Sequence, residues 1–117
     1  MLPFNGGEIW FEHLDGLYDH TELALEKLAA DAPVFQRPSS PSFIGFVLDE
    51  TEVTDDLIEM ITDKLLNTHK RFMRVGFIGA DSYTKRMLKK RLYGHGFALG
   101  FFLDFEKAKE WLVSEGI

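Results

Sequence analysis

The chain contains no cysteine among its 117 residues. This absence excludes disulfide bonds, thiol catalysis and metal sites built from thiolates. No apolar run comes near the roughly 20 residues that a membrane-spanning helix requires. The first residues also lack the basic start and apolar core of a signal peptide, so we expect a cytoplasmic protein without a membrane partner.

Short catalytic and phosphate-binding motifs are missing as well. The patterns G-x-x-x-x-G-K-[ST], G-x-G-x-x-G and G-x-S-x-G do not occur. The four histidines show neither the H-x-x-x-H nor the H-E-x-x-H spacing of zinc sites. These absences favour a non-enzymatic protein with no cofactor and no metal.

Charge is unevenly distributed along the chain, whose formal net charge is −6. Residues 64–91 hold nine of the thirteen basic residues but only one acid, Asp81. Such an asymmetry can orient a molecule toward a partner. The acidic net charge disfavours nucleic acid. Two interpretations remain, a solvated basic helix and pairing of the basic patch with another protein or a second copy; the patch comprises Lys85, Arg86, Lys89 and Lys90.

Three apolar runs lead into an acidic residue and then into a helix start. The runs cover 43–48, 75–80 and 97–103, and they are followed by Asp49, Asp81 and Asp104. Repetition of strand, turn and helix predicts a parallel sheet with both faces covered. No internal sequence repeat is evident beyond this order of elements.

The remaining pattern completes the predicted fold. A strand over 8–13 precedes a helix that starts at Asp19 and ends near Ala30, with Pro33 marking its exit. Helices follow over 55–69 and 82–93, and a last one begins at Asp104. We therefore predict one α/β domain over residues 1–117, a four-stranded, mainly parallel sheet flanked by four helices. The first strand is either parallel to its neighbour or an antiparallel edge strand.

Three segments carry a resemblance to a known family. They are Phe46-Val47-Leu48-Asp49 with Val53-Thr54, then the strand from Met73 to Gly79, and the tail from Phe102 to Leu112. Together they resemble STAS domains, and in particular the SpoIIAA-like group. The resemblance implies an α/β fold of this kind and a regulatory module that works by protein interaction rather than by catalysis.

The chain departs from that family at the regulatory position. In the anti-sigma antagonists, a serine at the start of the helix after the central strand is phosphorylated and switches partner binding. Residues 43–81 of this chain contain no serine. Either Thr54 takes its place, or Asp55 and Asp56 supply a fixed negative charge at the same helix start. We expect a module without the phosphoserine switch.

The candidate site follows from the predicted topology. Because the carboxyl ends of parallel strands meet at one edge of a sheet, the residues after the strands should gather there. We expect this edge to bind a protein partner or to sense a small anionic or lipid-like ligand. The alternative is a metal-dependent enzyme or receiver-like module with Asp49, Asp81 and Asp104 around Mg²⁺. The candidate binding residues are Asp49, Glu50, Thr51, Thr54, Asp55, Asp56, Gly79, Asp81 and Ser82.

Overall fold

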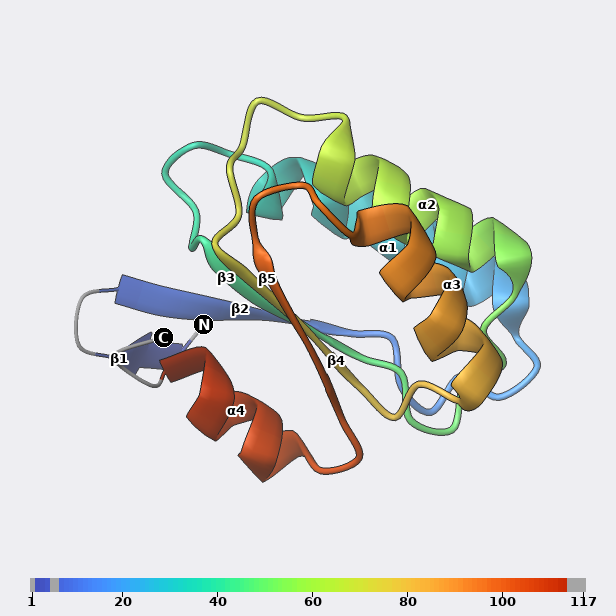
Figure 1. The fold of residues 1–117 in the computed structure, drawn as a ribbon. Coiled ribbons are helices and arrows are strands. Elements are labelled where there is room, and N and C mark those ends of the chain that lie inside the picture. Colours follow the sequence, from blue (N-terminus) through green and yellow to red (C-terminus); the bar gives the residue numbers. More distant parts are fainter. Residues whose placement is uncertain (1, 5–6, 114–117) are drawn as a thin grey trace.

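A parallel sheet of four strands forms the centre of the protein. The computed structural model describes residues 2–4 and 7–113. The strands pair in the order in which they follow one another along the chain, and each is parallel to the next. The α/β fold expected from the sequence is confirmed (Figure 1). The four strands are β2 (Gly7–His13), β3 (Phe43–Val47), β4 (Arg74–Ile78) and β5 (Ala98–Phe102).

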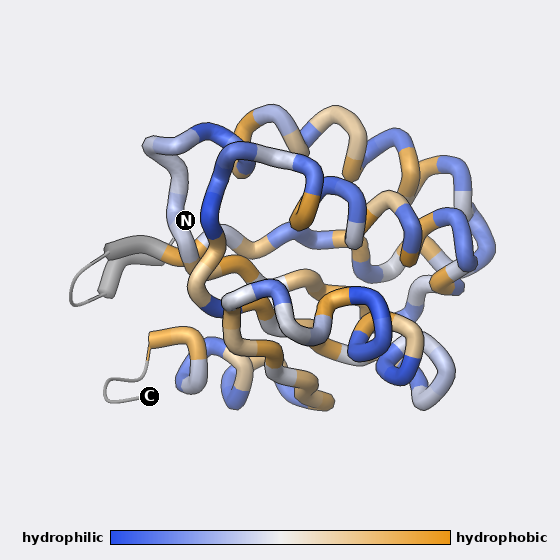
Figure 2. Tube along the Cα trace, turned by 45° about the horizontal axis from the view of Figure 1, so that its top comes forward, coloured by the Kyte–Doolittle hydropathy of each residue, from blue (hydrophilic) through white to orange (hydrophobic). Residues whose placement is uncertain are grey.

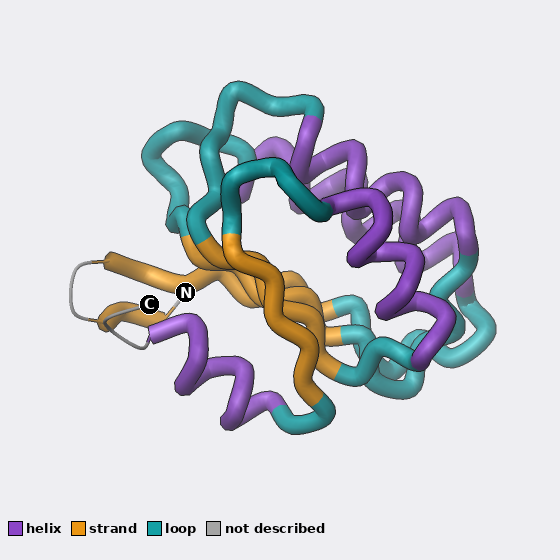
Figure 3. Tube along the Cα trace, in the orientation of Figure 1, coloured by secondary structure: helices purple, strands orange, loops and turns teal. Residues whose placement is uncertain are grey.

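Four helices cover the two faces of this sheet unequally. Helices α1, α2 and α3 lie on one face and α4 on the other (Figures 1 and 3). Successive crossovers of one hand that each step to the next strand place their helices on the same face. The chain changes face only after β5. The helices are α1 (Thr21–Phe35), α2 (Asp55–Leu66), α3 (Ser82–Leu92) and α4 (Phe105–Val113).

The amino-terminal segment adds a feature that the sequence did not indicate. Strand β1 (Leu2–Phe4) pairs antiparallel with β2, so the sheet has five strands in all. The strand predicted over 8–13 is β2, and it runs parallel to β3. The possibility of an antiparallel β2 at the sheet edge is therefore wrong. A three-residue strand is too short to show an alternating pattern, which is why β1 was missed.

Helix α1 is longer than predicted. It continues through Pro33 to Phe35 instead of ending near Ala30, and its N-cap is His20 rather than Asp19. Proline removes one helical hydrogen bond, but the buried stripe extends past it, because Ala32 and Phe35 are both fully buried. Tertiary packing therefore maintains the last turn of α1.

Helix α2 is shorter than predicted and ends at Leu66 rather than at residue 69. Lys70 consequently lies beyond the helix and is not a cation at its end. Its side chain is 7% exposed, and Nζ donates to the carbonyl oxygens of Ser40 and Pro38. Burial lowers the pKa of Lys70. This lysine joins two loops instead of contributing to a basic surface.

Strands β3, β4 and β5 share a five-residue pattern, so the absence of an internal repeat was a wrong conclusion. In each strand, a first residue of any type is followed by an aliphatic residue, Gly, Phe and a further apolar residue. The strands pair in matching register, so Gly45, Gly76 and Gly100 lie side by side across the sheet. The phenylalanines that follow them form a second row on the opposite face.

The glycine row allows α4 to approach the sheet closely. A Cβ at Gly76 would be 3.7 Å from the Trp111 ring and 3.8 Å from Leu112, both on α4. A Cβ at Gly45 would be only 2.8 Å from the Phe11 ring, and one at Gly100 only 2.7 Å from the Phe102 ring. The row therefore forms a shallow channel that α4 and two aromatic rings fill.

These distances predict that the same substitution, glycine to alanine, lowers stability more at Gly45 than at Gly76. Gly45→Ala should lower the free energy of unfolding by about 1–3 kcal/mol, because the new methyl group collides with the Phe11 ring. That ring cannot easily move aside, since Phe105 lies 4.6 Å beyond it. Gly76→Ala is the control, with ordinary contacts only, and should change stability by less than about 1 kcal/mol. Urea unfolding measures both, and equal losses would contradict this packing.

Candidate functional site

Two loops interlock at the carboxyl edge of the sheet. The loop after β2 and the loop after β3 run side by side and exchange backbone hydrogen bonds. Gly16 N–H donates to the Asp49 carbonyl at 2.8 Å, and Tyr18 N–H donates to the Glu50 carbonyl at 2.8 Å. Glu52 N–H returns a bond to the Tyr18 carbonyl, also at 2.8 Å. The two loops thus form one small, continuous surface.

Thr51 connects the same two loops through its side chain. Its hydroxyl donates to the Leu14 carbonyl at 2.5 Å and accepts from the Leu17 N–H at 3.1 Å. Because both the donor and the acceptor capacity of the hydroxyl are used within the protein, the role of Thr51 is to hold the surface together.

Tyr18 and Glu50 have unusual backbone conformations. Their φ angles are 49° and 55°, and they are the only non-glycine residues with positive φ in the described ranges. The Tyr18 hydroxyl donates to Glu50 Oε2 at 2.8 Å, and this bond raises the pKa of Tyr18. Left-handed backbone is unfavourable for both residue types, and such strain concentrates at functional sites. The sequence showed nothing special at Tyr18.

The amino-terminal ends of α2 and α3 also meet at this edge. Thr54 caps α2 by accepting from Leu57 N–H at 3.2 Å, and Asp81 caps α3 by accepting from Thr84 N–H at 2.8 Å. The bond from the Thr84 N–H lowers the pKa of Asp81. Both residues therefore serve first as helix caps.

Tyr83 links the two helix starts. Its hydroxyl donates to Asp55 Oδ1 at 2.7 Å, which raises the pKa of Tyr83. Tyr83 is 44% exposed. The buried face of α3 belongs to Thr84, Leu88 and Leu92, and Tyr83 points toward Asp55 of α2.

The remaining predicted residues occupy the same edge. Gly79 has a φ of +81°, and a Cβ there would collide with the Asp49 carboxyl group and stand 2.9 Å from its backbone nitrogen. This glycine is therefore required where the loops after β3 and β4 touch. Asp56 and Ser82 are exposed at the starts of α2 and α3. The structure thus brings all nine predicted residues to one edge.

The metal alternative receives no support from this arrangement. Asp81 caps α3, and Asp104 Oδ1 accepts from the Glu106 N–H at 2.8 Å at the start of α4. In the part of the chain that the structure describes, no three histidine or carboxylate side chains are placed to share a metal ion. Asp81 and Asp104 thus serve as acceptors at the starts of α3 and α4.

No local motif marks Glu12, whose pKa is the most perturbed among the residues that the structure describes. Glu12 of β2 is 1% exposed, and burial raises its pKa to about 8. Its Oε1 accepts from Trp10 Nε1 at 3.1 Å, while Lys27 Nζ of α1 lies 3.8 Å from Oε2. The alternation of strand residues is the signal that could have found it, because Glu12 lies between Trp10 and Leu14 on the inward face.

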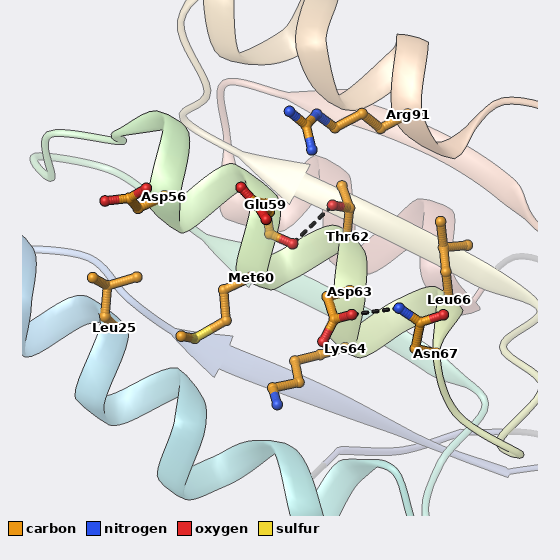
Figure 4. Close-up of a pocket in the computed structure, with 10 residues that line it drawn as sticks. All are labelled: Leu25, Asp56, Glu59, Met60, Thr62, Asp63, Lys64, Leu66, Asn67 and Arg91. Carbon is orange, nitrogen blue, oxygen red and sulfur yellow. Dashed lines mark hydrogen bonds between the residues drawn. The ribbon is translucent and has the colours of Figure 1, made fainter.

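A surface groove of about 630 Å³ runs along α2. Figure 4 shows apolar side chains of α1 and α2 beside several acids of α2, with Arg91 reaching in from α3. The groove lies on the outside of the helical layer and reaches Asp56 at the start of α2. Its lining comprises Leu25, Asp56, Glu59, Met60, Thr62, Asp63, Lys64, Leu66, Asn67 and Arg91.

Comparison with known proteins adds no relative to this picture. No family model, no curated protein and no solved structure matches the chain. Within the described residues, no helix is both long enough and apolar enough to cross a membrane.

Proposed function

We propose that this protein is a cytoplasmic, non-enzymatic regulatory module of the STAS type that binds a protein partner through its carboxyl-edge surface. We define this surface as residues 49–56, the turn 79–82, and the tyrosines Tyr18 and Tyr83. The serial order of parallel strands and helices is what the resemblance to STAS domains implies.

The strained pair of Tyr18 and Glu50 is the observation that carries the proposal. Tyr18 is 60% exposed although its backbone is held in the left-handed region and its hydroxyl is fixed by Glu50. Tyr83 is likewise exposed and fixed by Asp55. Tyrosine side chains held in one orientation are frequent binding hot spots, because little entropy is lost when a partner covers them.

The structure of the α2 start supports binding without a phosphoserine switch. The Thr54 hydroxyl is occupied as the helix cap. Asp55 and Asp56 already place negative charge in the first turn of α2, where the helix dipole favours it. The module would thus present permanently the charge that phosphorylation adds in the resembled family.

Affinity capture with the full chain as bait tests this proposal. A specific partner retained by the wild type should be lost or strongly reduced with Tyr18→Ala and with Glu50→Ala. With the purified partner, we expect each substitution to weaken binding at least about 30-fold, which corresponds to a hot spot of about 2 kcal/mol.

Matched controls separate this surface from the rest of the molecule. Lys107→Ala and Glu110→Ala change exposed charges on α4, on the opposite face of the sheet, and should leave the partner bound. Circular dichroism verifies that all variants are folded. A partner that binds wild-type and carboxyl-edge variants with equal affinity would refute the proposed surface.

A further inference from the structure

The outer face of the helical layer is divided by charge. Helix α3 carries five bases and no acid, whereas α2 carries four acids and a single base, Lys64. The two helices are neighbours on the same face of the sheet, with α1 beyond α2 (Figure 1). The five bases are Lys85, Arg86, Lys89, Lys90 and Arg91, and the four acids are Asp55, Asp56, Glu59 and Asp63.

Some of the bases in residues 64–91 are used in contacts within the protein. Lys70 is buried, and Arg74 donates from Nη1 to the Trp111 carbonyl at 2.9 Å near the end of α4. The bases of α3 therefore form a compact patch. Leu88 and Leu92 are buried beneath that helix, so the periodicity turns Arg86 and Lys90 outward, four residues apart.

The acids of α2 form a matching outward row. Asp56, Glu59 and Asp63 are exposed and follow the i, i+3, i+7 spacing of one helix face. With a rise of 1.5 Å per residue the acidic row spans about 10 Å, and the row of Arg86 and Lys90 spans about 6 Å. Rows of this length can face one another when two helices lie side by side.

These charges do not neutralise each other within one molecule. In the part of the chain that the structure describes, no ion pair joins a base of α3 to an acid of α2. Lys85 and Lys89 instead lie 5.7 and 5.6 Å from the centre of the Phe101 ring. Figure 2 shows that hydrophilic and hydrophobic residues alternate along the helices of this layer, as expected for helices that expose one polar face.

We propose that this face of the helical layer binds a second copy of the chain. A twofold axis that lies in the plane of the interface, along α2 and α3 and midway between them, brings α3 of each copy over α2 of the other. The same acidic and basic rows then pair twice, which is the self-complementarity that a twofold interface requires. The groove adds apolar side chains beside the charged rows, namely Leu25, Met60 and Leu66.

The proposed dimer shares only Asp56 with the carboxyl-edge surface. Its contacts come from the outer rows of α2 and α3, so a partner can be lost without loss of the dimer, and the reverse. Exposed ion pairs contribute little energy but determine register and orientation. We therefore expect a dimer of micromolar affinity rather than a tight one.

Charge exchange on both helices tests the dimer. The acid variant is Arg86→Glu with Lys90→Glu, and the base variant is Glu59→Lys with Asp63→Lys. Sedimentation velocity from about 1 to about 200 μM covers the range expected for a weak interface. We expect the wild type to dimerise in this range, each double variant to stay monomeric, and an equal mixture of the two variants to form the heterodimer.

The control carries the same charge change on the opposite face of the sheet. Glu106→Lys with Glu110→Lys on α4 should dimerise like the wild type. A wild type that is monomeric at every concentration overturns the proposal. So does a mixture of the two charge variants that stays monomeric, because restored complementarity must restore the contact. The proposal is also overturned if the wild type stays monomeric and binds an acidic protein or nucleic acid through α3. The basic row would then serve that partner.

Discussion

Replacing Glu12 by glutamine should raise the free energy of unfolding by about 5 kcal/mol at high pH and leave it nearly unchanged in acid. Glu12 is 1% exposed, and its pKa rises from an ordinary 4.5 to about 8 because burial disfavours the ionised carboxylate. The neighbouring Asp31 also raises the pKa of Glu12, whereas Trp10 and Lys27 lower it.

The direction of the effect follows from proton uptake. Below pH 4.5 both the folded and the unfolded chain hold the Glu12 proton, so its contribution to stability is complete. Between pH 4.5 and about 8 only the folded chain holds it, and stability falls by about 1.4 kcal/mol per pH unit. Above that range both states are ionised and the loss is complete. Glutamine has a similar shape and no proton to lose.

Urea unfolding of both proteins at about pH 5, 7 and 9 measures this difference. The advantage of Glu12→Gln should grow steadily with pH. Glu26→Gln removes a carboxylate from the exposed side of α1 and should not reproduce the gain. A constant difference between wild type and Glu12→Gln across the range would show that Glu12 is ionised at neutral pH, contrary to this account.

Phe77→Ala should cost about 3–5 kcal/mol, a large fraction of the stability of a domain of this size. Phe77 is the centre of the phenylalanine row and is fully buried. Its ring stacks on Phe46 at 5.3 Å and on Phe101 at 5.5 Å, with interplanar angles of 14° and 18°. Truncation leaves a cavity bounded by rigid strands, so both neighbouring rings lose contacts that cannot be replaced.

The position of a phenylalanine within the row predicts how much its truncation lowers the free energy of unfolding. Phe101 is half-buried on the edge strand β5, so Phe101→Ala should cost clearly less than Phe77→Ala. Phe77→Leu retains part of the volume and provides a measurable intermediate if the alanine variant does not fold. Chemical denaturation gives all three values. Equal losses at the centre and the edge of the row would show that the stack is not the main source of this stability.

Much of the fold was predictable because its determinants are local. The apolar runs of β3, β4 and β5 show what strands buried on both faces require. Asp81 and Asp104 precede helices and accept hydrogen bonds from their first turns, as the sequence indicated. The convergence of the nine candidate residues followed from the parallel order alone, since every strand then ends at the same edge.

The candidate site was predictable in position but not in detail. The left-handed backbone of Tyr18 and Glu50 depends on bonds between two loops 32 residues apart. The exposure of Tyr83 depends on Asp55 of another helix, 28 residues away. Tyrosine and glutamate do not favour left-handed backbone, so no local pattern reveals the conformations of Tyr18 and Glu50.

The alternation of strands and helices and the caps of α3 and α4 depend on residues close together along the chain, so the sequence alone was enough to predict them. The direction of β2, the passage of α1 through Pro33 and the alignment of the three glycines beneath α4 became visible only in the folded molecule. So did the burial of Glu12 and its raised pKa. These features depend on which surfaces meet. Burial in a shared interior can override what a residue prefers in isolation, such as the ionised state of Glu12 or the tendency of Pro33 to end a helix.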